Sequence, residues 1–71
     1  MKGINVNNSI GEMAGKVWTA LYKNGEMTIT KIKNDLKADV FVINAAVGWL
    51  AREGKVDITK KGNSIKAKLV D

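Results

Sequence analysis

The ionisable side chains of this 71-residue sequence are better suited to binding phosphate groups than to catalysis. The chain contains no histidine, the commonest general base and metal ligand, and no cysteine for a thiolate site or a disulfide. Its seven acidic residues are scattered, and Glu12 and Asp39 stand where helices are predicted to begin. We therefore expect no enzyme active site, no metal site and no cofactor.

Lysine side chains supply most of the positive charge in a chain whose net charge is +5. This charge permits nucleic-acid binding, although it is also ordinary for solubility. Lysines that contact phosphates give salt-sensitive and weakly specific binding. The alternative, which the sequence leaves open, is that these lysines only keep strand edges solvated and unpaired. The candidate nucleic-acid-binding residues are Lys31, Lys33, Lys37, Lys60, Lys61, Lys66 and Lys68.

Apolar periodicity predicts two helices in the first half of the chain. The first spans residues 10–23, because Ser9 opens a capping box and Gly25 ends the periodic run. The second spans residues 29–37, with Thr28 as its N-cap. Three of the candidate lysines lie on this second helix.

A third helix, from Asp39 to Gly54, is the element around which the rest of the chain is organised. Asp39 can accept a hydrogen bond from the first turn, and Gly54 can adopt the left-handed conformation that ends a helix. The short joint before Asp39 predicts a steep crossing with the second helix, as in a helix-turn-helix. The predicted core-facing stripe contains Val40, Ile43, Ala46, Val47 and Leu50.

The period of the pattern changes after the third helix. Apolar and polar residues alternate in residues 56–60 and 65–70, which is typical of half-buried strands. Lys61-Gly62-Asn63 between them is a turn signal, so we expect an antiparallel hairpin with one face on the helices.

The chain as a whole is predicted to be one small domain preceded by an arm. Residues 1–8 are polar and rich in asparagine, so we expect a flexible N-terminal arm, with residues 9–71 forming the domain. Residues 26–27 are extended, and whether they form a short additional strand stays open.

Three segments resemble a family of short stand-alone winged helix-turn-helix proteins of uncharacterised function from bacteria and archaea. They are residues 15–18 (Gly-Lys-Val-Trp), residues 25–28 (Gly-Glu-Met-Thr) and the run from Ala46 to Lys55. The resemblance covers residues 9–69. It implies an α+β winged helix-turn-helix fold, with three helices followed by a two-stranded antiparallel wing, and it implies DNA binding by analogy of fold. The chain departs from the family at positions 41 and 42, where charged residues are expected.

In such a fold the third helix would be the recognition helix, yet it has no lysine or arginine between Asp39 and Ala51. A helix that reads the major groove presents Arg, Lys, Asn or Gln to base edges, and here Asn44 is the only amide. Arg52 lies at the far end of the helix. This composition argues against ordinary major-groove readout.

The outer face of the third helix is largely apolar and is predicted to be an interface. Small residues there would let a second helix approach closely, so that two copies pair in a two-fold dimer or a partner protein covers the face. The other interpretation is burial within one chain, with Trp49 beneath the wing and Phe41 against the arm. Gly48 is predicted to allow close packing against the first helix or a partner. The interface residues are Phe41, Val42, Ala45, Gly48, Trp49 and Arg52.

The leading prediction is a DNA-associated module, similar to transcription regulators, that binds double-stranded DNA through backbone contacts of the second helix and the wing. The alternative is a protein-interaction or homodimerisation module that uses the third helix without DNA. No apolar stretch approaches the ~20 residues that a membrane helix needs, and no signal peptide is visible. We therefore expect a cytoplasmic protein with no membrane contact and no small-molecule ligand.

Overall fold

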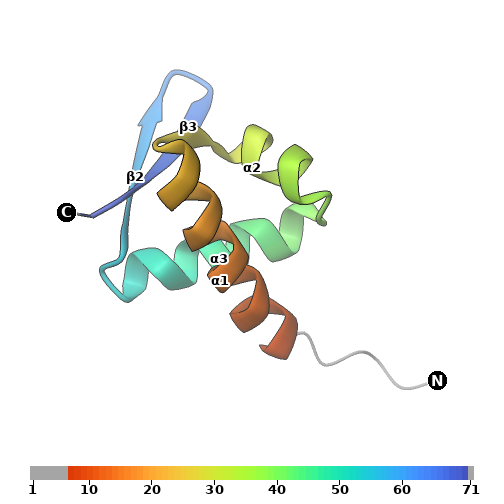
Figure 1. Cartoon of the computed structure of the whole chain (residues 1–71). Helices are drawn as coiled ribbons and strands as arrows, with labels where there is room; N and C mark the ends of the chain where they lie inside the picture. The colour runs from red at the N-terminus through yellow and green to blue at the C-terminus, as the bar shows by residue number, and fades with distance from the viewer. Residues whose placement is uncertain (1–6, 71) are drawn as a thin grey trace.

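The computed structural model describes residues 7–70, and its element order matches the predicted sequence of helices and strands (Figure 1). The short strand left open at residues 26–27 is present and comprises Met27 and Thr28. The elements are α1 (Asn7–Asn24), β1 (Met27–Thr28), α2 (Ile29–Leu36), α3 (Val40–Arg52), β2 (Val56–Lys61) and β3 (Ser64–Leu69).

The predicted caps of α2 and α3 are confirmed. The Thr28 hydroxyl accepts a hydrogen bond from the Lys31 N–H at 3.1 Å, and the Asp39 carboxylate accepts one from the Phe41 N–H at 2.7 Å. Gly54 follows α3 with φ +73°, a left-handed conformation that glycine adopts without steric penalty. These local interactions fix where the two helices begin and where the second of them ends.

One predicted helix boundary is wrong, and a second, predicted at about Lys37, differs by one residue. α1 begins at Asn7, so Ser9 lies inside the helix and its capping box does not mark the start; residues 1–6 of the predicted arm lie outside the described residues. α2 ends at Leu36 because Lys37 is left-handed, with φ 50° and ψ 45°, and cannot continue the helix.

The three strands form one antiparallel sheet in the order β1-β3-β2. Ala67 lies in the central strand β3, between Met27 on β1 and Ile58 on β2. Ala67 and Met27 are buried against the helices, whereas the opposite face of the sheet is exposed. The hairpin β2–β3, with Gly62 in its turn at φ +61°, is called the wing below.

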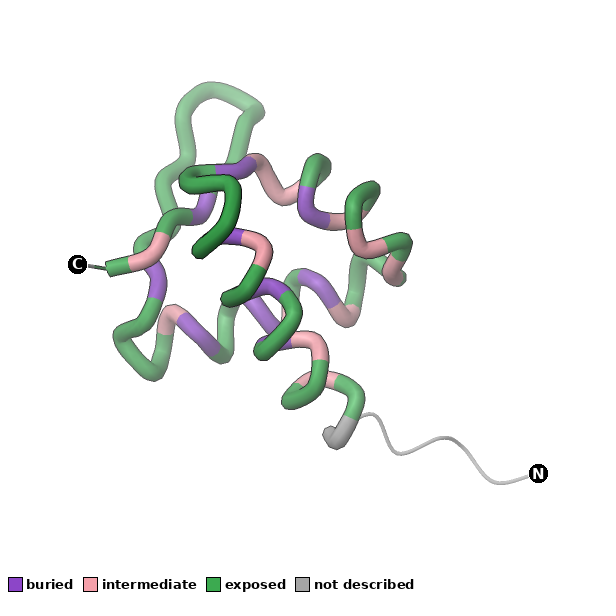
Figure 2. Tube along the Cα trace, in the orientation of Figure 1, coloured by how far each residue is buried: buried purple, intermediate pink, exposed green. Residues whose placement is uncertain are grey.

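The core lies between α1, α3 and the inner face of the sheet, as the buried residues in Figure 2 show. Val40 is an exception to the predicted stripe of α3: it is 48% exposed, because the first turn of the helix extends past the core. The other four residues of that stripe are confirmed as buried. Fully or nearly fully buried residues include Val17, Leu21, Ile32, Ile43, Ala46, Val47, Leu50, Val56 and Ala67.

Within residues 7–70, none of the helices combines the length and the apolar character that crossing a lipid bilayer requires.

Candidate nucleic-acid interface

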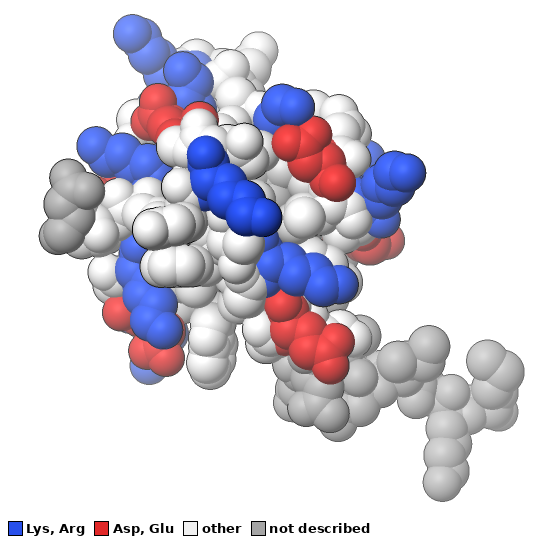
Figure 3. Space-filling view, viewed as in Figure 1, with Lys and Arg blue, Asp and Glu red and all other residues white. Residues whose placement is uncertain are grey.

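The register of the wing places its lysines on two faces. Lys61 is paired with Ser64, and Lys66 with Thr59, so both lysines lie on the outer face of the hairpin. Lys60 is paired with Ile65 and projects from the inner face, beyond the end of the core. All three lysines are exposed, and basic side chains project from the end of the molecule that the wing occupies in Figure 3. The far half of the wing therefore presents positive charge on both of its faces.

Lys68 has a different environment from the other wing lysines. Its cross-strand partner is Asp57, on the same outer face of the hairpin. An acidic residue directly opposite a lysine offsets the local positive potential. Lys68 is therefore a weaker candidate for a phosphate contact than Lys61 or Lys66.

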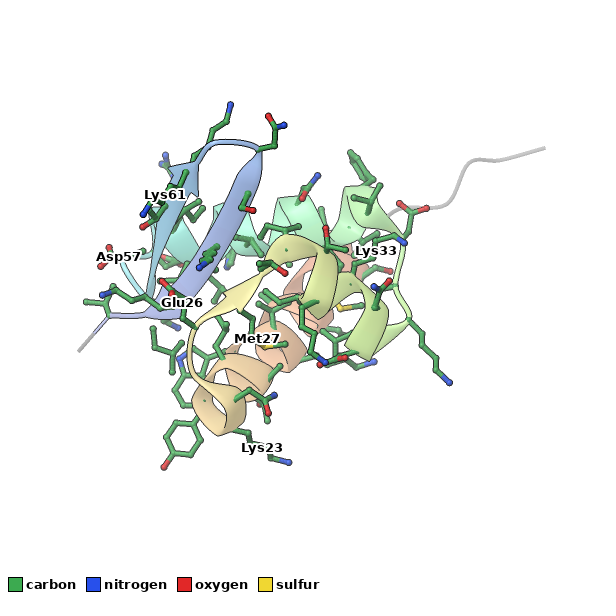
Figure 4. All side chains as sticks on the ribbon, turned by 90° about the horizontal axis from the view of Figure 1, so that it is seen from above. Lys23, Glu26, Met27, Lys33, Asp57 and Lys61 are labelled. Atoms are coloured by element: carbon green, nitrogen blue, oxygen red, sulfur yellow. The ribbon has the colours of Figure 1, made fainter. Side chains whose placement is uncertain are left out.

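The three lysines near α2 also differ from one another. The Lys31 ammonium forms an ion pair with Asp35 at 2.9 Å, one turn along an exposed side of the helix. Lys33 is half-buried and carries no such pair among the described residues. Figure 4 shows Lys33 on α2 and Lys61 on the wing, well apart from Lys23 at the end of α1. Lys33 and Lys37 are thus the α2-side residues with charge available for a phosphate.

Lys37 is the one non-glycine residue with positive φ in the described part of the chain. A side-chain-bearing residue in the left-handed region is less stable there than glycine, by about 1 kcal/mol. The position joins α2 to α3, where a glycine would adopt the left-handed conformation at lower cost. A strained lysine at an exposed turn is thus a candidate for a functional side chain.

We expect Lys37→Gly to raise the free energy of unfolding by about 0.5–1 kcal/mol while weakening duplex DNA binding about threefold or more. Lys37→Ala is the matched control, since it removes the same charge but keeps the unfavourable conformation. Urea denaturation and fluorescence anisotropy with labelled DNA measure the two effects. If the glycine variant binds DNA as tightly as the natural chain, Lys37 has no role in the interface.

The outer face of α3 is exposed to solvent. Phe41 is 60% exposed and Trp49 52% exposed, while Val42 and Ala45 are half-buried at the edge of the α1 contact. The interpretation that Trp49 lies buried beneath the wing is therefore wrong. The proposed cover for Phe41 belongs to the N-terminal residues outside the described range. The helix presents an apolar surface, with Arg52 exposed at its end.

Gly48 lies in the middle of this face, and nothing within 4 Å would meet a Cβ atom placed there. Close packing of Gly48 against α1, one of the two predicted reasons for a glycine, is therefore absent. Glycine in a helix interior is less favourable than alanine by about 1 kcal/mol. Among residues 7–70, no contact explains that cost.

A hollow of about 420 Å³, lined by both polar and apolar residues, lies where the wing, the start of α2 and α3 come together. It brings Asn44 from α3 beside Asn63 and Ser64 of the wing and beside Thr30 of α2. The sequence interpretation noted Asn44 alone and missed this group. The other members are uncharged polar residues at a helix start and a turn, and only the packing of the wing beside α3 brings them together.

A second hollow, of about 640 Å³, lies on the surface between α1 and the C-terminal half of α3. Trp18 and Trp49 line it together with two exposed glycines of α1 and with Lys55. Trp18 also stacks on Tyr22, with ring centroids 5.3 Å apart and planes inclined by 11°. The apolar surface of α3 thus continues onto α1.

On the face seen in Figure 3, basic and acidic side chains are interspersed. Within residues 7–70, no three His, Cys, Asp or Glu residues lie close enough together to hold a metal ion.

A family model described as "Winged helix-turn-helix domain (DUF2582)" matches residues 5–69 of the chain. The chain belongs to this family. It is also 37% identical over 54 residues to the uncharacterized protein MJ1608 from Methanocaldococcus jannaschii, a match that covers 72% of this chain and 76% of that one.

Solved structures share the same fold. The solution NMR structure of protein BT2368 from Bacteroides thetaiotaomicron is 35% identical, with a TM-score of 0.79 over 92% of this chain and 79% of that one. The Zalpha domain from Carassius auratus PKZ, solved in complex with Z-DNA, is 19% identical, with a TM-score of 0.77 over 87% of this chain and 98% of that one. The predicted α+β winged helix-turn-helix fold and the predicted family are therefore confirmed.

In this winged helix-turn-helix domain, α2 and α3 form the helix-turn-helix unit, and Lys37 lies in its turn. The candidate lysines come from α2, from the turn that follows it and from the wing. The exposed face of α3 presents Phe41, Gly48 and Arg52 instead. The domain therefore places its positive charge beside α3 rather than on the first three turns of α3.

Proposed function

We propose that this winged helix-turn-helix domain is a non-enzymatic, regulator-like module that binds double-stranded DNA through the phosphate backbone. The observation that carries the proposal is the position of the available lysines on the wing and at the α2–α3 turn, which leads directly into α3. The fold is shared with a Zalpha domain that was solved with Z-DNA, which supports a nucleic-acid partner. The proposed contact residues are Lys33, Lys37, Lys60, Lys61 and Lys66, with Lys31 and Lys68 contributing less because of their acidic neighbours.

The composition of α3 favours backbone contacts over base readout. Base edges in the major groove are read by Arg, Lys, Asn and Gln, whereas the exposed centre of α3 has Phe41 and Gly48. Contacts to phosphates carry no direct sequence information. We therefore expect similar affinities for duplexes of unrelated sequence.

Salt dependence tests this proposal. Four or five lysine–phosphate contacts give a slope of about −4 in a plot of log affinity against log salt concentration. Fluorescence anisotropy with two labelled duplexes of unrelated sequence, between about 50 and 200 mM salt, measures both the slope and the sequence preference. A slope near zero, or no binding at about 50 mM salt, would contradict backbone binding.

A second function is favoured by a different observation, the exposure of Phe41 and Trp49 on one helix face. Exposed aromatic side chains that form a contiguous apolar surface usually mark a protein interface. We propose that the outer face of α3 is a protein-interaction surface, as an alternative to DNA binding by the lysines beside it.

A further inference from the structure

The outer face of α3 has a near-symmetric arrangement about Ala45. Phe41 precedes Ala45 by one helical turn, and Trp49 follows it by one turn. We propose that this face binds a second copy of the chain, with the two α3 helices antiparallel and a two-fold axis passing at Ala45. This inference rests on the proposed interaction role of α3, not on the proposed DNA binding.

An antiparallel two-fold pair centred on Ala45 matches the aromatic residues. Each residue that precedes the axis lies at the same height as the residue that follows it by the same number of positions in the other copy. Phe41 and Trp49 of the second copy therefore lie at the same height, on opposite sides of the helix pair, and both lie within the contact. Both side chains are more than half exposed in the single chain and gain most from such burial.

The same arrangement explains Gly48. With 3.6 residues per turn, Phe41 and Gly48 lie on one side of the Ala45 line and Val42 and Trp49 lie on the other. A two-fold axis perpendicular to both helices keeps each side and reverses only the direction along the helix, so Phe41 faces Gly48 of the second copy and Trp49 faces Val42. The open space above Gly48 then receives the side chain of Phe41.

Charges at the ends of the paired helices are complementary in this register. Arg52, at the last turn of α3, lies opposite Ala38 of the second copy, next to the N-cap residue Asp39. Glu53 lies opposite Lys37 of the second copy. All four charged side chains are exposed in the single chain, and the opposed ends of the helix dipoles also favour the antiparallel orientation.

The area of this face predicts a weak dimer. With 60% of Phe41 and 52% of Trp49 exposed, the two side chains contribute on the order of 250 Å² per copy. Close approach over Ala45 and Gly48 brings the total to about 1,000 Å², near the lower limit of specific interfaces. We therefore expect dissociation in the range of about 10–500 µM, which sedimentation at high protein concentration can measure.

Cysteine cross-linking tests the position of the axis, since the natural chain has no cysteine. Helices in close contact lie about 8 Å apart, so two Ala45 positions on the axis come within reach of a disulfide. We expect Ala45→Cys to form a covalent dimer under mild oxidation at about 0.5 mM protein. Asn34→Cys, at an exposed position on α2, is the matched control and should remain monomeric.

The variant Gly48→Leu tests dimer formation without disturbing the fold of the single chain. A Cβ atom at this position meets nothing within 4 Å in the single chain, so this variant should fold at least as stably as the natural chain. The leucine would occupy the space assigned to Phe41 of the second copy, so we expect at least a tenfold weaker dimer in sedimentation. Phe41→Lys should likewise give a folded monomer.

The possible results distinguish the antiparallel pair centred on Ala45 from the more general proposal that α3 is an interaction surface. If the natural chain sediments as a monomer at 1 mM, self-association through α3 is wrong and so is the antiparallel pair. If the natural chain forms a dimer that Phe41→Lys abolishes, but Ala45→Cys cross-links no better than Asn34→Cys, the interaction surface stands and the axis at Ala45 is wrong. Neither result depends on DNA binding.

Discussion

Removing the two lysines at the tip of the wing should weaken DNA binding about tenfold or more at about 50 mM salt. Lys60 and Lys61 precede the Gly62 turn, are exposed, and project from opposite faces of the hairpin. Losing two phosphate contacts should also reduce the steepness of the salt dependence by about 2, from a slope near −4 to a slope near −2. Anisotropy titrations of Lys60→Ala/Lys61→Ala across a salt series measure both quantities.

The matched control removes the same charge from another face. Lys16 and Lys23 are exposed on α1, and Figure 4 places Lys23 far from the wing. Lys16→Ala/Lys23→Ala therefore lowers the net charge equally but should change the slope by less than about 0.5. Equal losses in the two double variants would mean that net charge alone, rather than the wing, attracts DNA.

Replacing Ile43 with alanine should lower the free energy of unfolding by about 3 kcal/mol. Ile43 is fully buried on the side of α3 that packs against α1, and truncation leaves a cavity that a small core cannot easily fill. A domain of this size has only about 4–10 kcal/mol of total stability, so the variant should unfold at a much lower urea concentration. Urea denaturation followed by tryptophan fluorescence or circular dichroism measures the change.

Val40→Ala is the control for this prediction. The sequence pattern places Val40 on the same stripe as Ile43, whereas the structure leaves it 48% exposed. We therefore expect a loss below about 1 kcal/mol, because little apolar surface is removed from contact and alanine favours the helix. If the two substitutions destabilise the protein equally, the first turn of α3 packs against the core and its position in the structure is wrong.

The sequence alone was enough to predict those parts of the structure that depend on interactions between residues close together in the chain. Thr28 and Asp39 cap helices through hydrogen bonds to residues two or three positions away, so their role could be predicted from local sequence. The strand pattern is equally local. The start of α1 was missed because Ser9 has the spacing of a capping box, yet the helix extends through it to Asn7.

Features that depend on how the helices and strands pack could not be predicted from the sequence as well. Helical periodicity cannot say how far along α3 the core extends, and Val40 lies just beyond its end. Exposure of Phe41 and Trp49 could not be decided either, since the same residues would be buried if the wing or the arm covered them. The polar group around Asn44 depends on three separate elements that meet only in the folded domain.

Among the candidate lysines, one acidic neighbour could be predicted from the sequence and another could not. The pairing of Lys31 with Asp35 follows the helical spacing of four residues and could have been predicted. Placing Lys68 opposite Asp57 required the register of the hairpin, which a shift of one residue would have changed. The available positive charge of the interface is therefore better defined by the fold than by the list of lysines.

An amide NMR titration with mixed-sequence duplex DNA, at low and then at near-physiological salt, tests the central claim most directly. Backbone binding predicts salt-sensitive shifts at Lys33, Lys37, Lys60, Lys61 and Lys66, with little change at Phe41 and Gly48. The absence of shifts even at low salt would contradict DNA binding, and shifts centred on Phe41 and Gly48 would show that α3 itself enters the groove.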